Sequence, residues 1–169
     1  MIAFASRHRV VLGVIAAIAV ALGVFVLVWF QPQKLVIEDK VNEAAPATAA
    51  PTGAAPTAAP KPLQGSFRSF EHPTKGRAVV VDSGSGRVLR LEGFETSNGP
   101  DVVVWLSTAY PRSIGDTAVA RDYVHLGRLK GNIGNQNYEI PAGTDLSKHS
   151  SVVVWCRRFN VAFGAAKLS

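Results

Sequence analysis

Sulfur is nearly absent from this sequence: 169 residues hold one cysteine, Cys156, and one methionine, Met1. A single chain therefore cannot form an internal disulfide, a four-cysteine zinc site or an iron–sulfur cluster. A blue-copper centre usually adds a methionine to two histidines and a cysteine. Because no histidine follows Cys156 and Met1 lies far away, we expect no copper site and no other metal site.

Familiar catalytic motifs are missing as well. The sequence has no G-x-S-x-G elbow, phosphate-binding loop, H-E-x-x-H or dinucleotide fingerprint. Eighteen basic and twelve acidic residues give a net charge of +6, but the basic residues are scattered. These absences argue against hydrolases and kinases, and nucleic acid is not expected as a partner.

One long apolar run is present near the amino terminus. Residues 10–30 are all apolar or glycine, and 21 residues of helix at ~1.5 Å per residue span the ~30 Å core of a bilayer. Arg7 and Arg9 precede this run, and only Lys34 follows closely. The positive-inside rule then predicts a single-pass signal anchor in the cell membrane, with residues 1–9 cytoplasmic and the rest extracytoplasmic. The lipid bilayer is thus an expected partner through residues 10–30.

A cleaved secretory signal is the alternative interpretation. Ala19-Val20-Ala21 resembles a small-residue cleavage site. However, the apolar run continues beyond Ala21 and ends in Trp29-Phe30, an aromatic pair suited to the membrane interface. An uncleaved anchor therefore fits better.

Residues 31–62 have the composition of a linker. Residues 44–62 include nine alanines, five prolines and three threonines, and no large side chain that could offset the entropy of ordering. We expect a disordered Ala/Pro-rich spacer that reaches ~100 Å when fully extended as polyproline II. Leu35-Val36-Ile37 is either a short strand or the exit from the membrane.

Residues 63–169 consist of short runs rich in valine and aromatic residues, separated by Gly, Asn, Pro and Ser. The pattern predicts an all-β domain, an antiparallel β-sandwich of about eight strands. The expected strands are 66–70, 77–82, 87–95, 101–107, 123–127, 136–140, 151–157 and 160–168. The near copies DVVVWLS (101–107) and SVVVWCR (151–157) are apolar on both faces, so we expect them to be central. The alternation in 160–168 suggests a strand nearer an edge.

Cys156 supports three interpretations. It could be a small core residue, since free cysteine is among the most buried residue types. It could be a redox thiol or ligand if the charges of Arg157 and Arg158 come within reach. It could also form an intermolecular disulfide, because an odd cysteine in an exported chain has no internal partner.

Histidine offers few further ligands. His72 precedes Pro73 in a loop, His149 lies in a polar stretch, and His125 shares a strand face with Tyr123. The sequence allows a b-type haem, with Cys156 and His125 as candidate cofactor-binding residues, although nothing in the spacing requires it.

Four segments of the head follow one another in a recognisable order: GSF (65–67), RVLRLEGFETSNGPDVVVWLS (87–107), VHLGRLKGNIGNQNYEIP (124–141) and SVVVWCRRFNVAFGAAKL (151–168). In this order they resemble a known family, the DM-thirteen domain. The resemblance implies a β-sandwich in which the cysteine, here Cys156, acts in electron transfer as a redox thiol or a haem ligand. Within these 169 residues no DOMON or cytochrome module accompanies the domain, so the redox partner is expected to be a separate, unidentified protein.

Two functions follow from these observations. The first is a membrane-tethered extracytoplasmic domain with an electron-transfer role centred on Cys156, not expected to be an enzyme by itself. The second is a noncatalytic binding or adhesion module that recognises a ligand of the cell envelope.

Overall fold

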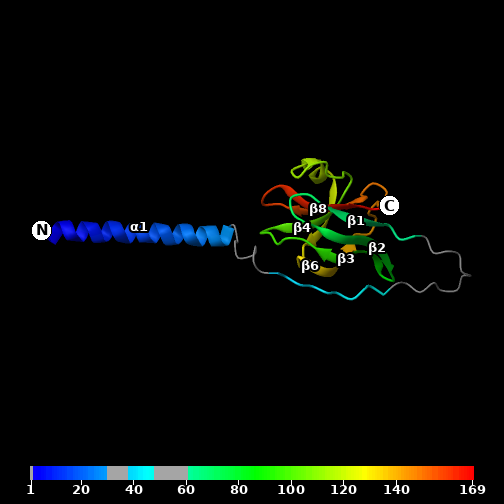
Figure 1. Ribbon diagram of the computed structural model, residues 1–169, viewed down its shortest axis with the longest axis horizontal. Helices are drawn as coiled ribbons and strands as arrows, with labels where there is room; N and C mark the ends of the chain where they lie inside the picture. The colour runs from blue at the N-terminus through cyan, green and yellow to red at the C-terminus, as the bar shows by residue number, and fades with distance from the viewer. Residues whose placement is uncertain (1, 30–37, 48–60) are drawn as a thin grey trace, which may run out of the picture.

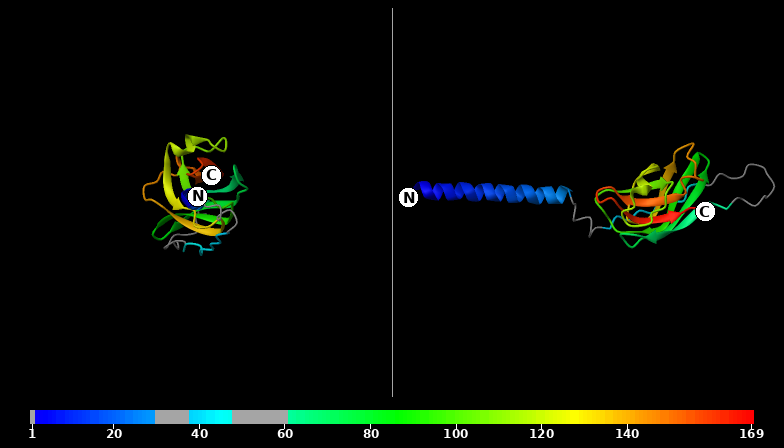
Figure 2. Two further views of the ribbon diagram at one scale, coloured as in Figure 1. Left: turned by 90° about the vertical axis from the view of Figure 1, so that its left-hand side faces the viewer. Right: turned by 90° about the horizontal axis from the view of Figure 1, so that it is seen from above.

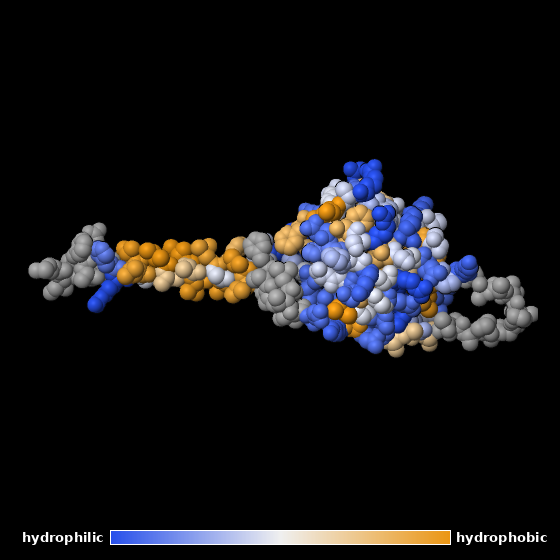
Figure 3. All heavy atoms as spheres, viewed as in Figure 1, coloured by the Kyte–Doolittle hydropathy of each residue, from blue (hydrophilic) through white to orange (hydrophobic). Residues whose placement is uncertain are grey.

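The computed structural model describes residues 2–29, 38–47 and 61–169, which form a long helix and a β-rich head (Figure 1). Helix α1 spans Ile2–Trp29, and its segment Val11–Trp29 is long and apolar enough to cross a membrane. Figure 3 shows the contrast between the apolar surface of this helix and the mixed surface of the head. A signal sequence near the amino terminus has the same properties. Leu35-Val36-Ile37 and residues 48–60 of the expected linker lie outside the described residues.

Eight antiparallel strands build the head, which confirms the predicted fold class. They are β1 (Gln64–Ser69), β2 (Lys75–Ser83), β3 (Gly86–Glu95), β4 (Val102–Ser107), β5 (Tyr123–Arg128), β6 (Ile133–Ile140), β7 (Ser151–Cys156) and β8 (Val161–Lys167). Their order is β5-β4-β7-β8-β1-β2-β3-β6. The left view of Figure 2 looks along α1 and shows the strands curving around the core.

Strand β1 joins the two layers of the sandwich. Residues 64–66 pair with β2, whereas residues 67–69 pair with β8. One layer consists of the first half of β1 with β2, β3 and β6. The other layer consists of the second half of β1 with β8, β7, β4 and β5. This arrangement leaves β5 and β6 as the two edges.

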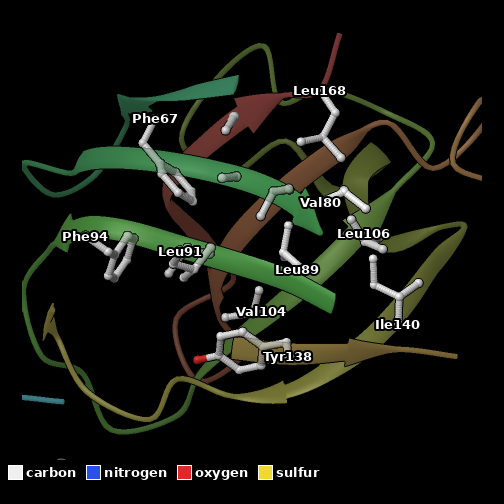
Figure 4. Close-up of a cluster of buried hydrophobic side chains, with 14 of the residues drawn as sticks. Phe67, Val80, Leu89, Leu91, Phe94, Val104, Leu106, Tyr138, Ile140 and Leu168 are labelled. Atoms are coloured by element: carbon white, nitrogen blue, oxygen red, sulfur yellow. The ribbon is translucent and has the colours of Figure 1, made fainter. Parts of the chain in front are cut away.

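Strands β4 and β7 are central, as expected from their continuous apolar sequences, and all six residues of each are buried. The inner side of β7 contributes Val152, Val154 and Cys156 to the large interior cluster, part of which Figure 4 shows. The outer side contributes Val153 and Trp155 to a second cluster. Both sides of β4 and β7 carry large apolar residues because each side faces packed side chains rather than water.

The outer cluster lies under the long connection between β4 and β5. Val119, in the 3-10 helix η2 (Thr117–Ala120), is fully buried in this cluster, and Tyr110 packs against it. Asp116 caps η2 by accepting a hydrogen bond from the backbone N–H of Ala118. The connection thus acts as a third layer over β4 and β7.

The expectation that the last strand lies nearer an edge is wrong. Strand β8 lies between β7 and β1 in the middle of the sheet. Large and small residues alternate in this strand because its two sides face different clusters. Ala162 and Ala165 are small residues of the outer cluster, whereas Phe163 belongs to the inner cluster.

Residues 38–47, here called the strap, run along edge strand β6. Lys40 forms a parallel bridge with Ile133, and the N–H groups of Val41 and Glu43 each donate a 2.9 Å bond to a β6 carbonyl. The carboxylate of Glu43 accepts a bond from Lys130 Nζ at 2.7 Å, which lowers its pKa below the ordinary value of 4.5. The strap covers an otherwise unpaired edge.

Candidate functional site

Cys156 is the last residue of β7 and points into the inner cluster. Its side chain is fully buried, with a relative exposure of 0%. Its register partners are Val102 on β4 and Val161 on β8. The thiol therefore lies at the end of the sandwich, among apolar side chains.

An ion cluster lies at this end, immediately beyond Cys156. The carboxylate of Asp101 accepts two hydrogen bonds from Arg157, at 3.0 and 2.9 Å, and one from Arg128 at 3.1 Å. The hydrogen bonding from Arg157 is the main cause that lowers the pKa of Asp101 below its ordinary value of 3.8. The guanidinium of Arg157 is thus paired with Asp101, and that of Arg158 contacts Trp29.

A stack of three aromatic rings lies on the opposite face of the same strands. The ring centroids of Trp155 and Trp105 are 5.6 Å apart, and those of Trp105 and Tyr123 are 4.2 Å apart. Trp155 and Trp105 are buried, whereas Tyr123 is 41% exposed. The stack therefore connects the residue next to Cys156 with the protein surface. The Trp105 Nε1 group is buried without a hydrogen-bond partner among the described residues.

The structure does not bring Cys156 and His125 together. His125 pairs with Trp105 in the middle of β4, whereas Cys156 pairs with Val102 at its start. On β5, Val124 and Leu126 pack against the inner cluster, so His125 lies on the other face, where it is exposed. It lines a surface cavity of about 720 Å³ together with Arg87 and Glu139.

His72 is closer to the inner cluster than the sequence suggested. Its ring packs against Phe163, with centroids 4.0 Å apart, and Phe163 belongs to the cluster that holds Cys156. The contact depends on backbone pairing of Phe70 and Glu71 with β8. No local pattern around His72 predicts that pairing. His149 instead lies 3.3 Å from Asp122 through Nε2.

The packing around Cys156 does not fit a haem. Two surface cavities flank the turn between β2 and β3, and Cys156 lines neither of them. Since its side chain is fully buried in the inner cluster, an iron atom could reach the sulfur only if that cluster opened. No group of three His, Cys, Asp or Glu side chains suited to a metal ion occurs within residues 2–29, 38–47 and 61–169.

The head is thus a small β-sandwich with one enclosed thiol and an aromatic stack that reaches the surface. The model of the family described as Electron transfer DM13 matches residues 66–168, which are most of the chain and nearly the whole head. The chain belongs to this family, the DM-thirteen family that the sequence resembles. The searches of curated proteins and of solved structures found no match.

Proposed function

We propose that this protein is a membrane-tethered electron-transfer domain on the outer face of the cell membrane. The match of the Electron transfer DM13 family to almost the entire head carries this proposal. The apolar segment Val11–Trp29 and the arginines before it support an anchor with the amino terminus in the cytoplasm.

Cys156 is the proposed redox group. One-electron oxidation would convert the thiol to a thiyl radical, with the electron passing to a separate acceptor protein and the proton to water at the end of the sandwich. The enclosed position of the sulfur favours electron transfer without direct contact, because disulfide exchange requires an accessible thiolate. The stack of Trp155, Trp105 and Tyr123 supports this role, since it leads from the neighbouring residue to the surface.

A noncatalytic binding module of the cell envelope is the second candidate. The complete burial of Cys156 favours it, because a buried cysteine often serves only as a small apolar residue. In that case the exposed surface of the head, not the thiol, would carry the function.

Oxidation of the full-length protein by a one-electron acceptor such as ferricyanide separates the two candidates. Electron transfer predicts that Cys156→Ser abolishes the reaction, while the control Ala166→Ser, which adds a hydroxyl to the same inner cluster, retains it. Equal rates for both variants and the native protein would leave the binding module as the function.

The anchor is tested separately in membranes of expressing cells. An uncleaved anchor predicts that the protein stays in the membrane after alkaline carbonate washing and that its mass includes residues 2–29. A mature chain beginning at Leu22 would show that the helix is a cleaved signal.

A further inference from the structure

The turn between β7 and β8 presents an apolar side chain next to a cation. Phe159 is 50% exposed, and Arg158 precedes it. The backbone N–H of Ala162 donates a 2.7 Å bond to the carbonyl of Ile114, which is 42% exposed. We call Ile114, Arg158 and Phe159 the docking tip. Apolar side chains together with a basic one are the combination that binds the interface of an anionic membrane.

The docking tip lies at the end of the head that faces α1. Arg158 Nη1 donates a 2.8 Å hydrogen bond to the carbonyl of Trp29, and its guanidinium lies 4.4 Å from the centre of the Trp29 ring. Trp29 is the last residue of the apolar segment of α1. Figure 1 shows this end of the head turned toward the helix.

The strap holds the head close to that helix. The N–H of Asp39 donates a 2.7 Å bond to Asn132, in the loop between β5 and β6. That loop is at the same end, because Leu129 bonds to Val102, the register partner of Cys156. Ten Cα–Cα steps separate Trp29 from Asp39, so the chain between them spans at most ~35 Å. The head therefore cannot use the full length of the linker to move away.

In the described part of this end, the half-buried Arg158 is a cation without an acidic partner. Arg157 and Arg128 are paired with Asp101, Lys130 with Glu43, and Arg112 with Asp116. Among the described residues, Arg158 has no carboxylate partner, and its guanidinium bonds to the carbonyl of Trp29 and lies over the Trp29 ring. Acidic phospholipid headgroups supply the missing negative charge.

We propose that the docking tip binds the bilayer that holds α1, with Phe159 and Ile114 in the interface and Arg158 on anionic headgroups. This inference rests on the proposed membrane anchor. Such a contact is weak by itself, but the tether raises its effective concentration. Docking would place Cys156 near the membrane. Tyr123 would lie away from the membrane, because it pairs with Ser107 at the other end of β4. A soluble partner would then meet the exposed end of the aromatic stack.

The test uses the full chain reconstituted in phosphatidylcholine vesicles with or without phosphatidylglycerol. A thiol-reactive fluorophore is attached at Phe159→Cys, or at Ser85→Cys in the exposed turn between β2 and β3 as the control. Native protein, whose Cys156 is buried, is treated in parallel as the blank. Docking predicts several-fold stronger quenching by doxyl-labelled lipid at position 159 than at position 85.

Charge reversal tests the role of Arg158. In vesicles with phosphatidylglycerol, Arg158→Glu is expected to reduce the quenching at position 159 several-fold. The matched control Arg121→Glu, an exposed arginine near Tyr123 at the other end, leaves it unchanged.

Two results would overturn the inference in distinguishable ways. Vesicles that float with the protein but show equal quenching at positions 159 and 85 would eliminate docking and leave the anchor intact. A chain that does not float with the vesicles would eliminate both the anchor and the docking.

Discussion

The two sides of β7 differ in what they connect. Its inner side, with Cys156, faces a cluster closed to solvent. Its outer side, with Trp155, faces a stack that ends at the half-exposed ring of Tyr123. Trp155 and Cys156 are both buried, but only the outer side continues through stacked rings to an exposed residue. The inner side therefore encloses the thiol, while the outer side links the residue next to it to the surface.

The largest effect is expected from removing the ring that lies next to Cys156. Trp155 is only 1% exposed, so Trp155→Ala leaves a large cavity and should cost ~3–5 kcal/mol of unfolding free energy. Urea unfolding of the head measures this loss. A loss below ~1 kcal/mol would mean that the layer over β4 and β7 collapses into the space, and the outer side would not be rigid.

Two substitutions of Cys156 separate the effect of lost volume from the effect of added polarity on the stability of the inner cluster. Cys156→Ala should cost ~1–2 kcal/mol through a small cavity. Cys156→Ser restores most of the volume but buries a hydroxyl without a partner, which costs ~1–3 kcal/mol. Thermal unfolding compares the two variants. A serine variant as stable as native protein would show that water reaches this position.

Asp101 tests how tightly the end of the inner cluster is closed. Asp101→Asn removes the charge that pairs with Arg157 and Arg128, and should cost ~1–2 kcal/mol and speed alkylation of Cys156. Because the folded pKa of Asp101 is lowered, its contribution is present above the ordinary value of 3.8 and is lost as the pH falls through the folded pKa.

The free energy of unfolding, measured across this acidic range, checks whether stability falls with pH as expected. Native protein should lose stability more steeply there than Asp101→Asn does, because the variant lacks the titrating group. Parallel pH curves would show that the ion cluster is too solvated to matter.

The smallest effect is expected at the exposed end of the stack. Tyr123→Ala removes a stacked but half-exposed ring and should cost ~0.5–1.5 kcal/mol. If the stack conducts electrons, this variant also slows oxidation by ferricyanide, whereas Tyr110→Phe, which keeps its ring at the edge of the outer cluster, does not. An unchanged oxidation rate in Tyr123→Ala would show that electrons do not leave the protein through the aromatic stack.

Most of the fold could be predicted from local sequence. The continuous apolar runs around Trp105 and Trp155 indicated central strands, and those strands are central. Small residues in β8 misled the prediction, because Ala162 and Ala165 look neutral in sequence yet pack under the outer cluster. The alternation of residues along a strand shows which side chains are apolar, but it does not show which other elements cover them.

The candidate site was predictable only in part. Cys156 stood out because it is the one thiol, and the family match includes its position. The strap on β6, the contact of His72 with Phe163 and the aromatic stack depend on pairings between residues distant in the chain. No spacing within a single segment indicates them.

The sequence alone determined the apolar helix, the eight strands and the family of the head, because hydrophobic pattern and turn residues act locally along the chain. Only the tertiary structure decided that Cys156 faces inward and His125 outward, and that residues 38–47 lie along β6. Those outcomes depend on strand register, and a shift of one residue in a strand would exchange the two faces of that strand.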